Sequence, residues 1–138
     1  MADIRIHAGG YQFEAELKRE DAPKTCALFL SILPYRERII HVRWSGEGCW
    51  IPLGEKDFGL GFENATSFPA PGDFLLYPGG YSETEFLLAY GGVRFASKMG
   101  QLAGNHFMTV TKGRENLVAL GKKTLWDGAQ DILFERIG

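Results

Sequence analysis

The sequence predicts one mainly β domain over residues 1–138, a closed antiparallel β-barrel with two capping α-helices. Paired glycines, as at residues 9–10 and 79–80, separate short apolar runs in the manner of tight turns between strands. Apolar and polar residues alternate in several of these runs, which is the pattern of a sheet with one face in water. Only two segments show the 3.6-residue period of a helix. No linker-like segment divides the chain, and its length is that of a single domain.

The first helix is predicted over residues 22–33. Apolar residues recur there at i, i+3, i+4 and i+7, in the stripe Cys26, Phe29, Leu30 and Leu33. Asp21 is expected to cap the helix, because its side-chain oxygen can accept a hydrogen bond from a free backbone N–H. Pro23 suits the first turn, and Pro34 is expected to end the helix.

Most of the remaining chain is predicted as strands. They are residues 3–8, 11–18, 38–46, 49–53, 73–78, 83–91, 93–97 and 106–111. Residues 54–72 are rich in Gly, Asn and Pro and are expected to form a long loop with one short strand. A second helix is predicted over residues 113–126, followed by a last strand, with Leu117, Val118, Leu120 and Leu125 on one side. The residues expected to be buried are Tyr11, Phe13, Leu17, Phe29, Leu33, Val42, Phe86 and Leu88.

Charge and composition argue against several classes of partner. The net charge is −2 and the basic residues are scattered, so nucleic acid is not an expected ligand. No apolar run approaches the ~18 residues of a membrane span, and the N-terminal residues alternate in polarity, unlike a signal peptide. A cytoplasmic location with no membrane partner is therefore expected. His7, His41 and His106 lack the spacing of metal ligands, and the glycine pairs lack a phosphate-binding motif, so no metal or cofactor is predicted.

Glu83 and Glu85 form a pair of carboxylates near the turn of a predicted hairpin. On a strand, both side chains point to the same face. Two carboxyl groups about 5 Å or more apart could flank a substrate, but charged residues beside a hairpin turn usually only face water. The second interpretation is favoured for Glu83. Glu85, farther along the strand, remains a candidate catalytic residue.

Arg43 and Arg94 interrupt apolar strands, and two interpretations are open for each. The side chain could simply lie on the wet outer face of the barrel. It could instead offer a guanidinium for bidentate binding of a carboxylate or an amide oxygen. Trp44, Trp50 and Trp126 are expected to pack in the core or at a barrel end, although an aromatic residue beside Arg43 could also line a pocket.

Three segments resemble the cyclophilins, namely "FEAELKREDAPKTCALFLSIL", "GGVRFAS" and "GNHFMTVTKGRENLVAL". The resemblance implies a cyclophilin-like barrel and places Arg43 near the catalytic arginine, Arg94 near a glutamine of the active face and His106 near its histidine. Phe95 and Ala96 fall near the aromatic pair of the proline pocket. The alanine in that pair, and "GCWIPLG" in place of the usual strand of the pocket, argue against prolyl isomerase activity.

Other segments resemble a second family. "RWSGEGCWIPLG", "GFENATS", "PAPGDFLLYPGG" and "NHF" are similar to a bacterial and archaeal family with a cyclophilin-like fold, known as domain of unknown function 3830. That resemblance spans nearly the whole chain. It implies the closed barrel and implies no activity.

The leading hypothesis is a barrel-face site for a small anionic metabolite that carries a carboxylate or an amide. The expected ligand-binding residues are Arg43, Arg94, Trp44, Phe95 and Asn105, with His106 and Glu85 as candidate acid–base residues. Lys122, on the last helix, is expected to lie far from this site. Whether a reaction follows binding is left open. The alternatives are a peptidyl-prolyl cis-trans isomerase and a non-catalytic interaction module, possibly as a homo-oligomer.

Overall fold

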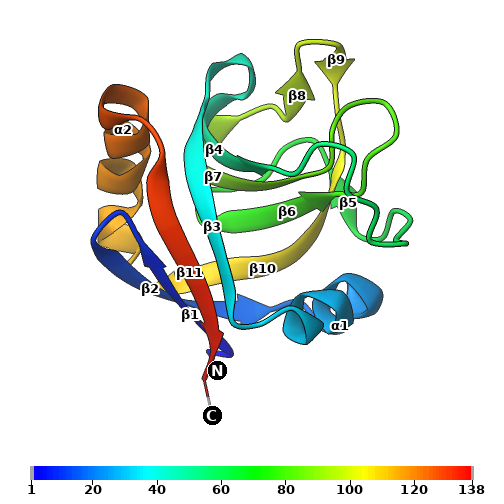
Figure 1. The fold of residues 1–138 in the computed structure, drawn as a ribbon, viewed down its shortest axis with the longest axis horizontal. Coiled ribbons are helices and arrows are strands. Elements are labelled where there is room, and N and C mark those ends of the chain that lie inside the picture. The colour runs from blue at the N-terminus through cyan, green and yellow to red at the C-terminus, as the bar shows by residue number, and fades with distance from the viewer. Residues whose placement is uncertain (1, 138) are drawn as a thin grey trace.

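Eight strands close into one antiparallel barrel in the computed structural model, which describes residues 2–137 (Figure 1). The strands are β1 (Ile4–Ala8), β2 (Tyr11–Leu17), β3 (Tyr35–Val42), β4 (Gly46–Pro52), β6 (Asp73–Tyr77), β7 (Glu85–Val93), β10 (Gly104–Lys112) and β11 (Gln130–Arg136). Their order around the barrel is β2-β1-β11-β3-β4-β7-β6-β10, and pairing of β10 with β2 closes it. The predicted fold class is confirmed. Three short strands lie outside this ring: β5 (Ala65–Thr66), β8 (Ala96–Ser97) and β9 (Gly100–Gln101).

The first hairpin shows how the sequence sets the two faces of the sheet. Gly9 and Gly10 form its turn with φ values of 58° and 90°, a backbone region that side chains disfavour. In β1, Ile4, Ile6 and Ala8 are buried, while the residues between them reach the barrel surface. The alternation predicted from the sequence therefore separates the barrel interior from its outer wall.

An aromatic core fills the barrel. Phe29 projects from α1 (Pro23–Ser31) and lies 5.8, 5.1 and 5.2 Å, between ring centroids, from Phe86, Phe107 and Phe134. Aromatic pairs in tilted or edge-to-face geometry contribute about 0.5–1.5 kcal/mol beyond their buried area. Helix α1 therefore plugs one end of the barrel, as the apolar stripe predicts.

The start of α1 differs from the prediction. Ala22 occupies the capping position and makes no side-chain hydrogen bond, while Asp21 is exposed. Glu63, from the long loop, accepts hydrogen bonds from the backbone N–H of Thr25 at 2.6 Å and from its hydroxyl at 2.7 Å. The carboxylate that satisfies the helix N-terminus thus comes from a distant segment, and the helix ends at Ser31, before residue 33.

Helix α2 (Leu117–Asp127) follows a short 3-10 turn, η2 (Arg114–Asn116), and covers another part of the barrel (Figure 1). Leu117 and Leu120 join the barrel core. Val118, predicted on the same buried side, is 49% exposed, and Trp126 is 78% exposed, so neither is a core residue. Neither helix in the described part of the chain has the length and apolar character needed to cross a bilayer.

A second apolar cluster lies on the other face of β6 and β7. It consists of Val42, Leu75, Tyr77, Leu87, Phe95 and Leu102. Val93 ends β7, and Arg94 and Phe95 lie between strands, so the predicted separate strand over residues 93–97 is reduced to β8. Six of the eight residues expected to be buried are buried: Phe13, Leu17, Phe29, Val42, Phe86 and Leu88. The other two, Tyr11 and Leu33, pack against the core while partly exposed.

Candidate functional site

A pocket of about 430 Å³ lies between α2 and the connection from β3 to β4, and we call it the Arg43 pocket. Its lining residues are His41, Arg43, Gly46, Glu47, Tyr90, Lys122, Leu125 and Trp126. Arg43 begins the 3-10 helix η1 (Arg43–Ser45) instead of continuing a strand, and its side chain is exposed. Lys122 lines the same pocket, which corrects the expectation that it lies far from Arg43. The volume is within the roughly 300–1,000 Å³ of small-molecule sites.

The two cations of the Arg43 pocket, Arg43 and Lys122, have no ionic partner in the described part of the chain. Among residues 2–137, no hydrogen bond or ion pair engages the side chain of Arg43 or that of Lys122. The nearby carboxylate of Glu47 accepts a hydrogen bond from the backbone N–H of Gly92 at 2.9 Å. Two cations against one carboxylate make the pocket electropositive, and charges that lack a partner inside the protein are free to bind a ligand.

His41 and Tyr90 form a polar pair in the wall of the Arg43 pocket. The His41 Nε2 atom lies 2.7 Å from the Tyr90 hydroxyl, and the buried His41 Nδ1 atom has no partner. Burial, and then the charge of Arg43, lower the pKa of His41 below its ordinary value of 6.5, so the ring is neutral at neutral pH. Burial raises the pKa of Tyr90, which keeps its proton. The pair is therefore an uncharged hydrogen-bond donor and acceptor.

Helix α2 packs closely against Tyr90 and supplies an aromatic residue, Trp126, to the wall of the Arg43 pocket. Gly121 lies directly against the ring of Tyr90, because a Cβ atom at this position would collide with the ring. Lys122 and Trp126 are four residues apart, so they share one face of the helix. The indole of Trp126 is 78% exposed beside the pocket.

Trp44, the aromatic residue that the sequence predicts to bind the ligand, is 49% exposed and packs edge-on against Trp50, at 5.8 Å between ring centroids.

Three further predicted ligand-binding residues, Arg94, Phe95 and Asn105, do not line the Arg43 pocket. Arg94 is exposed, and its backbone N–H donates to the Ser45 carbonyl at 3.0 Å, which places it next to η1. Phe95 is fully buried in the second apolar cluster. Asn105 is fully buried, and its amide oxygen accepts from the Glu63 N–H at 3.0 Å. Phe95 and Asn105 therefore support packing and the long loop, and their side chains do not line a surface site.

His106 lies on another side of the barrel, on β10 beside β6. Its Nε2 atom is 2.8 Å from the Thr109 hydroxyl and 3.2 Å from a carboxylate oxygen of Asp73. Burial would raise the pKa of Asp73, but hydrogen bonds from His106 and Thr109 help to hold it below its ordinary value. Both partners contact the same ring nitrogen, whereas a nucleophile–base–carboxylate arrangement uses the two nitrogens separately.

Arg94 and His106, which the sequence assigns to the same site as Arg43, do not line the Arg43 pocket. Within the described residues, no hydrogen bond or ion pair links His106 to Arg43 or Arg94. Instead, Lys122, Glu47 and Trp126 accompany Arg43.

Glu85 is almost completely buried, at 1% exposure, while Glu83 is exposed as predicted. One carboxyl oxygen of Glu85, Oε2, has no hydrogen-bond partner. Burial, reinforced by the charge of Glu83, raises the pKa of Glu85 to about 8. Glu85 therefore carries a proton at neutral pH. Its position opposite Tyr77 in the β6–β7 ladder places it beside the second apolar cluster.

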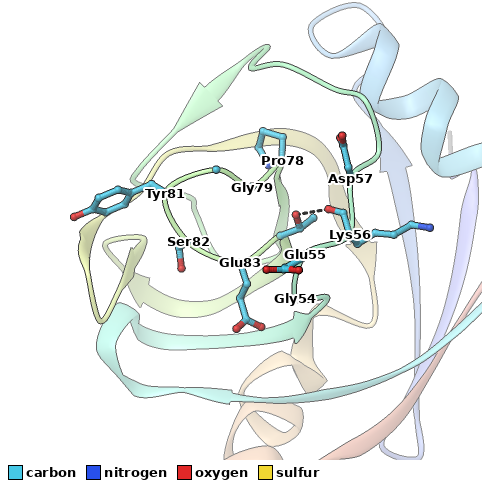
Figure 2. A pocket seen from close by; sticks show the side chains of 11 residues that line it. Gly54, Glu55, Lys56, Asp57, Pro78, Gly79, Tyr81, Ser82 and Glu83 are labelled. Atoms are coloured by element: carbon cyan, nitrogen blue, oxygen red, sulfur yellow. Dashed lines mark hydrogen bonds between the residues drawn. The ribbon is translucent and has the colours of Figure 1, made fainter.

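A larger cavity, of about 740 Å³, lies between residues 54–57 and residues 78–84 (Figure 2). A hydrogen bond of 2.6 Å from the Thr84 hydroxyl to the Lys56 carbonyl joins its two walls. The side chains of Glu55, Asp57 and Glu83 line it, with Lys56 as the single cation. This cavity is larger than the Arg43 pocket, but its excess of carboxylates makes it a poor match to the anionic ligand that the sequence predicts.

The described residues offer no group of three or more His, Cys, Asp or Glu side chains that could hold a metal ion. Cys26 and Cys49 are both buried, and burial raises the pKa of each thiol to about 11. Such thiols are protonated at neutral pH and are poor nucleophiles. The Arg43 pocket is therefore the better candidate for a functional site.

Several solved structures share the fold of this chain. A structure of McbB in complex with tryptophan has a TM-score of 0.72 and 19% identity, over 98% of this chain but only 45% of that chain. A hypothetical protein from Archaeoglobus fulgidus has a TM-score of 0.61 and 20% identity, over 99% and 95% of the two chains. A cyclophilin-type peptidyl-prolyl cis-trans isomerase from Cryptosporidium parvum, solved in the presence of the dipeptide Ala-Pro, has a TM-score of 0.63 and 16% identity, over 99% of both chains. The fold is cyclophilin-like, and identities this low show the fold alone.

Within this class, the chain belongs to the family described as protein of unknown function (DUF3830), whose model matches residues 4–135. The resemblance noted in the sequence is thereby confirmed. A comparison with curated proteins found no match.

Proposed function

We propose that the Arg43 pocket binds a small molecule that carries a carboxylate. The observation that supports this most is the pairing of Arg43 with Lys122, two cations from separate elements that line one pocket without an ionic partner among residues 2–137. A guanidinium fork and an ammonium group are the side chains best suited to bind a carboxylate. McbB, which shares the fold, has been solved with tryptophan, itself a small carboxylate.

The remaining lining residues suit the rest of such a ligand. The exposed indole of Trp126 offers an apolar surface, and the uncharged Tyr90–His41 pair can hydrogen-bond an amide or a hydroxyl group. Most of the lining is polar or charged, so polar contacts would supply most of the binding.

Small carboxylates such as benzoate, succinate and 3-phenylpropionate should raise the melting temperature. A ligand at a hundred times its dissociation constant stabilises the native state by about 2.7 kcal/mol, which is several degrees for a domain of this size. Arg43→Ala and Lys122→Ala should each remove most of this shift, because each deletes one of the two cations of the pocket.

Arg94→Ala and Lys98→Ala are the matched controls, because both side chains are exposed and neither lines the Arg43 pocket. Both variants should keep the shift. The proposal fails if no carboxylate changes the melting temperature, or if all four variants respond like the original protein.

The prolyl isomerase alternative predicts a different result. Phe95, which the resemblance places in the proline pocket, is fully buried, and its neighbour in that pocket is Ala96. We therefore expect negligible acceleration of cis–trans exchange in a proline-containing tetrapeptide. Uncatalysed exchange takes tens of seconds or longer, so catalysis would be easy to detect. A clear acceleration that Arg43→Ala abolishes would favour the isomerase instead.

A further inference from the structure

We infer that the ligand of the Arg43 pocket is a free α-amino acid with an apolar or aromatic side chain, held at both of its charged ends. This rests on the proposed carboxylate binding and adds a second anchor, the carboxylate of Glu47. Arg43 and Lys122 would bind the ligand carboxylate, and Glu47 would bind its ammonium group.

The structure holds the Glu47 carboxylate in a fixed position. Its Oε1 atom accepts the hydrogen bond from the Gly92 N–H at 2.9 Å. A Cβ atom at Gly91 would collide with the same oxygen, so the carboxylate can lie against β7 only because that residue is glycine. Its Oε2 atom makes no hydrogen bond within the described part of the chain, which leaves it free for an ammonium group. Glu47 is thus an oriented acceptor in the pocket wall.

Opposite charges meet at the same place in the pocket. The charges of Arg43 and Glu47 both act on the pKa of His41, in opposite directions, and both act on the pKa of Tyr90. Both charges therefore act close to the His41–Tyr90 pair, in the pocket that all four residues line. An α-amino acid carries its carboxylate and its ammonium group on one carbon, so it satisfies both charges at once. A simple acid leaves Glu47 unpaired, and a simple amine leaves the cations unpaired, which discriminates against both.

The apolar lining sets the class of side chain. Trp126 and Leu125 are the apolar residues that line the Arg43 pocket, and both lie on α2 next to Lys122. A ligand with its charged end at Lys122 would direct its side chain along this helix. An aromatic or branched apolar group can pack on the exposed indole, whereas glycine would gain nothing there.

Isothermal titration calorimetry with three related probes tests this inference. L-Phenylalanine has both charges, 3-phenylpropionate lacks the ammonium group and 2-phenylethylamine lacks the carboxylate. Phenylalanine should bind about tenfold tighter than 3-phenylpropionate, as expected for one added charge-assisted hydrogen bond, and 2-phenylethylamine should bind weakest. Glu47→Gln should weaken phenylalanine about tenfold without weakening 3-phenylpropionate. Glu55→Gln, the same change at an exposed carboxylate in the larger cavity, should alter neither affinity.

The outcomes separate this inference from the proposed function. If 3-phenylpropionate binds as tightly as phenylalanine and Glu47→Gln changes neither affinity, the amino-acid inference is overturned and carboxylate binding stands. If none of the three probes binds, both are overturned. If phenylalanine binds equally well to Arg43→Ala, the carboxylate anchor is wrong, and with it the two-ended arrangement.

Discussion

Glu85→Gln should stabilise the protein at neutral pH and flatten the dependence of its stability on pH. Burial, and then the charge of Glu83, raise the pKa of Glu85 from 4.5 to about 8 in the folded protein. The folded state therefore binds this proton more tightly than the unfolded chain does. Its stabilising effect is complete below about pH 4.5 and is lost as the pH rises to about 8. At pH 7 the buried carboxyl costs about 3 kcal/mol, a cost that an amide, which does not titrate, avoids.

Urea unfolding of the original protein and the variant at pH 5, 7 and 8.5 measures this effect. The difference in unfolding free energy should be smallest at pH 5 and should grow by about 3 kcal/mol or more toward pH 8.5. Glu55→Gln is the control, because its side chain is exposed and its charge is not among the causes of the raised pKa of Glu85, so it should change stability only slightly. Parallel pH profiles for the original protein and Glu85→Gln would show that Glu85 is ionised or solvated in the folded state.

The burial of Glu85 shows where prediction from the sequence stops. Two glutamates beside a hairpin turn are typical of a wet edge, and Glu83 fits that rule. Glu85 does not, because the second apolar cluster brings Phe95 and Leu102 onto the outer face of β6 and β7. These residues come from a later part of the chain, so no local pattern around Glu85 indicates that it is covered.

The fold itself was largely predictable because its signals are local. Alternation in polarity around Gly9 and Gly10 predicts the first hairpin, and the stripe that contains Phe29 predicts the helix that plugs the barrel. The helix cap was not predictable in the same way. Asp21 has the preferred residue type next to the helix, but the carboxylate that bonds Thr25 belongs to Glu63 in the long loop.

The Arg43 pocket was predictable only in part. A charged residue within an apolar run singled out Arg43, but Lys122 and Glu47 join it only through the packing of α2 against the β3–β4 connection. The sequence does contain one indication that Lys122 lies at an exposed site. Trp126 follows it by four residues on the same face of the helix, whereas the core contacts of that helix come from Leu117 and Leu120. A large aromatic residue outside the stripe of core residues indicates an exposed surface that can bind a ligand or a partner.

Asn105→Ala should cost about 3 kcal/mol of unfolding free energy, although the sequence predicts Asn105 as a ligand-binding residue. The side chain is fully buried, and its oxygen accepts from the Glu63 N–H. Its nitrogen donates to the Thr25 hydroxyl at 3.2 Å and to the Gly61 carbonyl at 3.0 Å. Alanine would remove the acceptor of the Glu63 N–H and the donor to the Gly61 carbonyl and the Thr25 hydroxyl, although that hydroxyl keeps its bond to Glu63. A buried polar group left unsatisfied costs about 1–3 kcal/mol. The anchor between the long loop and the start of α1 would loosen as well.

Thermal unfolding should show a melting temperature about 10 °C lower for Asn105→Ala, at roughly 3 °C per kcal/mol for a domain of this size. Asn116→Ala is the matched control, because the side chain of Asn116 makes no capping hydrogen bond at the start of α2. Binding of 3-phenylpropionate, measured well below the melting temperature, should be the same in both variants, since neither asparagine lines the Arg43 pocket. A ligand-binding role for Asn105 predicts the reverse, an unchanged melting temperature with lost binding, and that result would show that the hydrogen bonds of Asn105 do not hold the fold together.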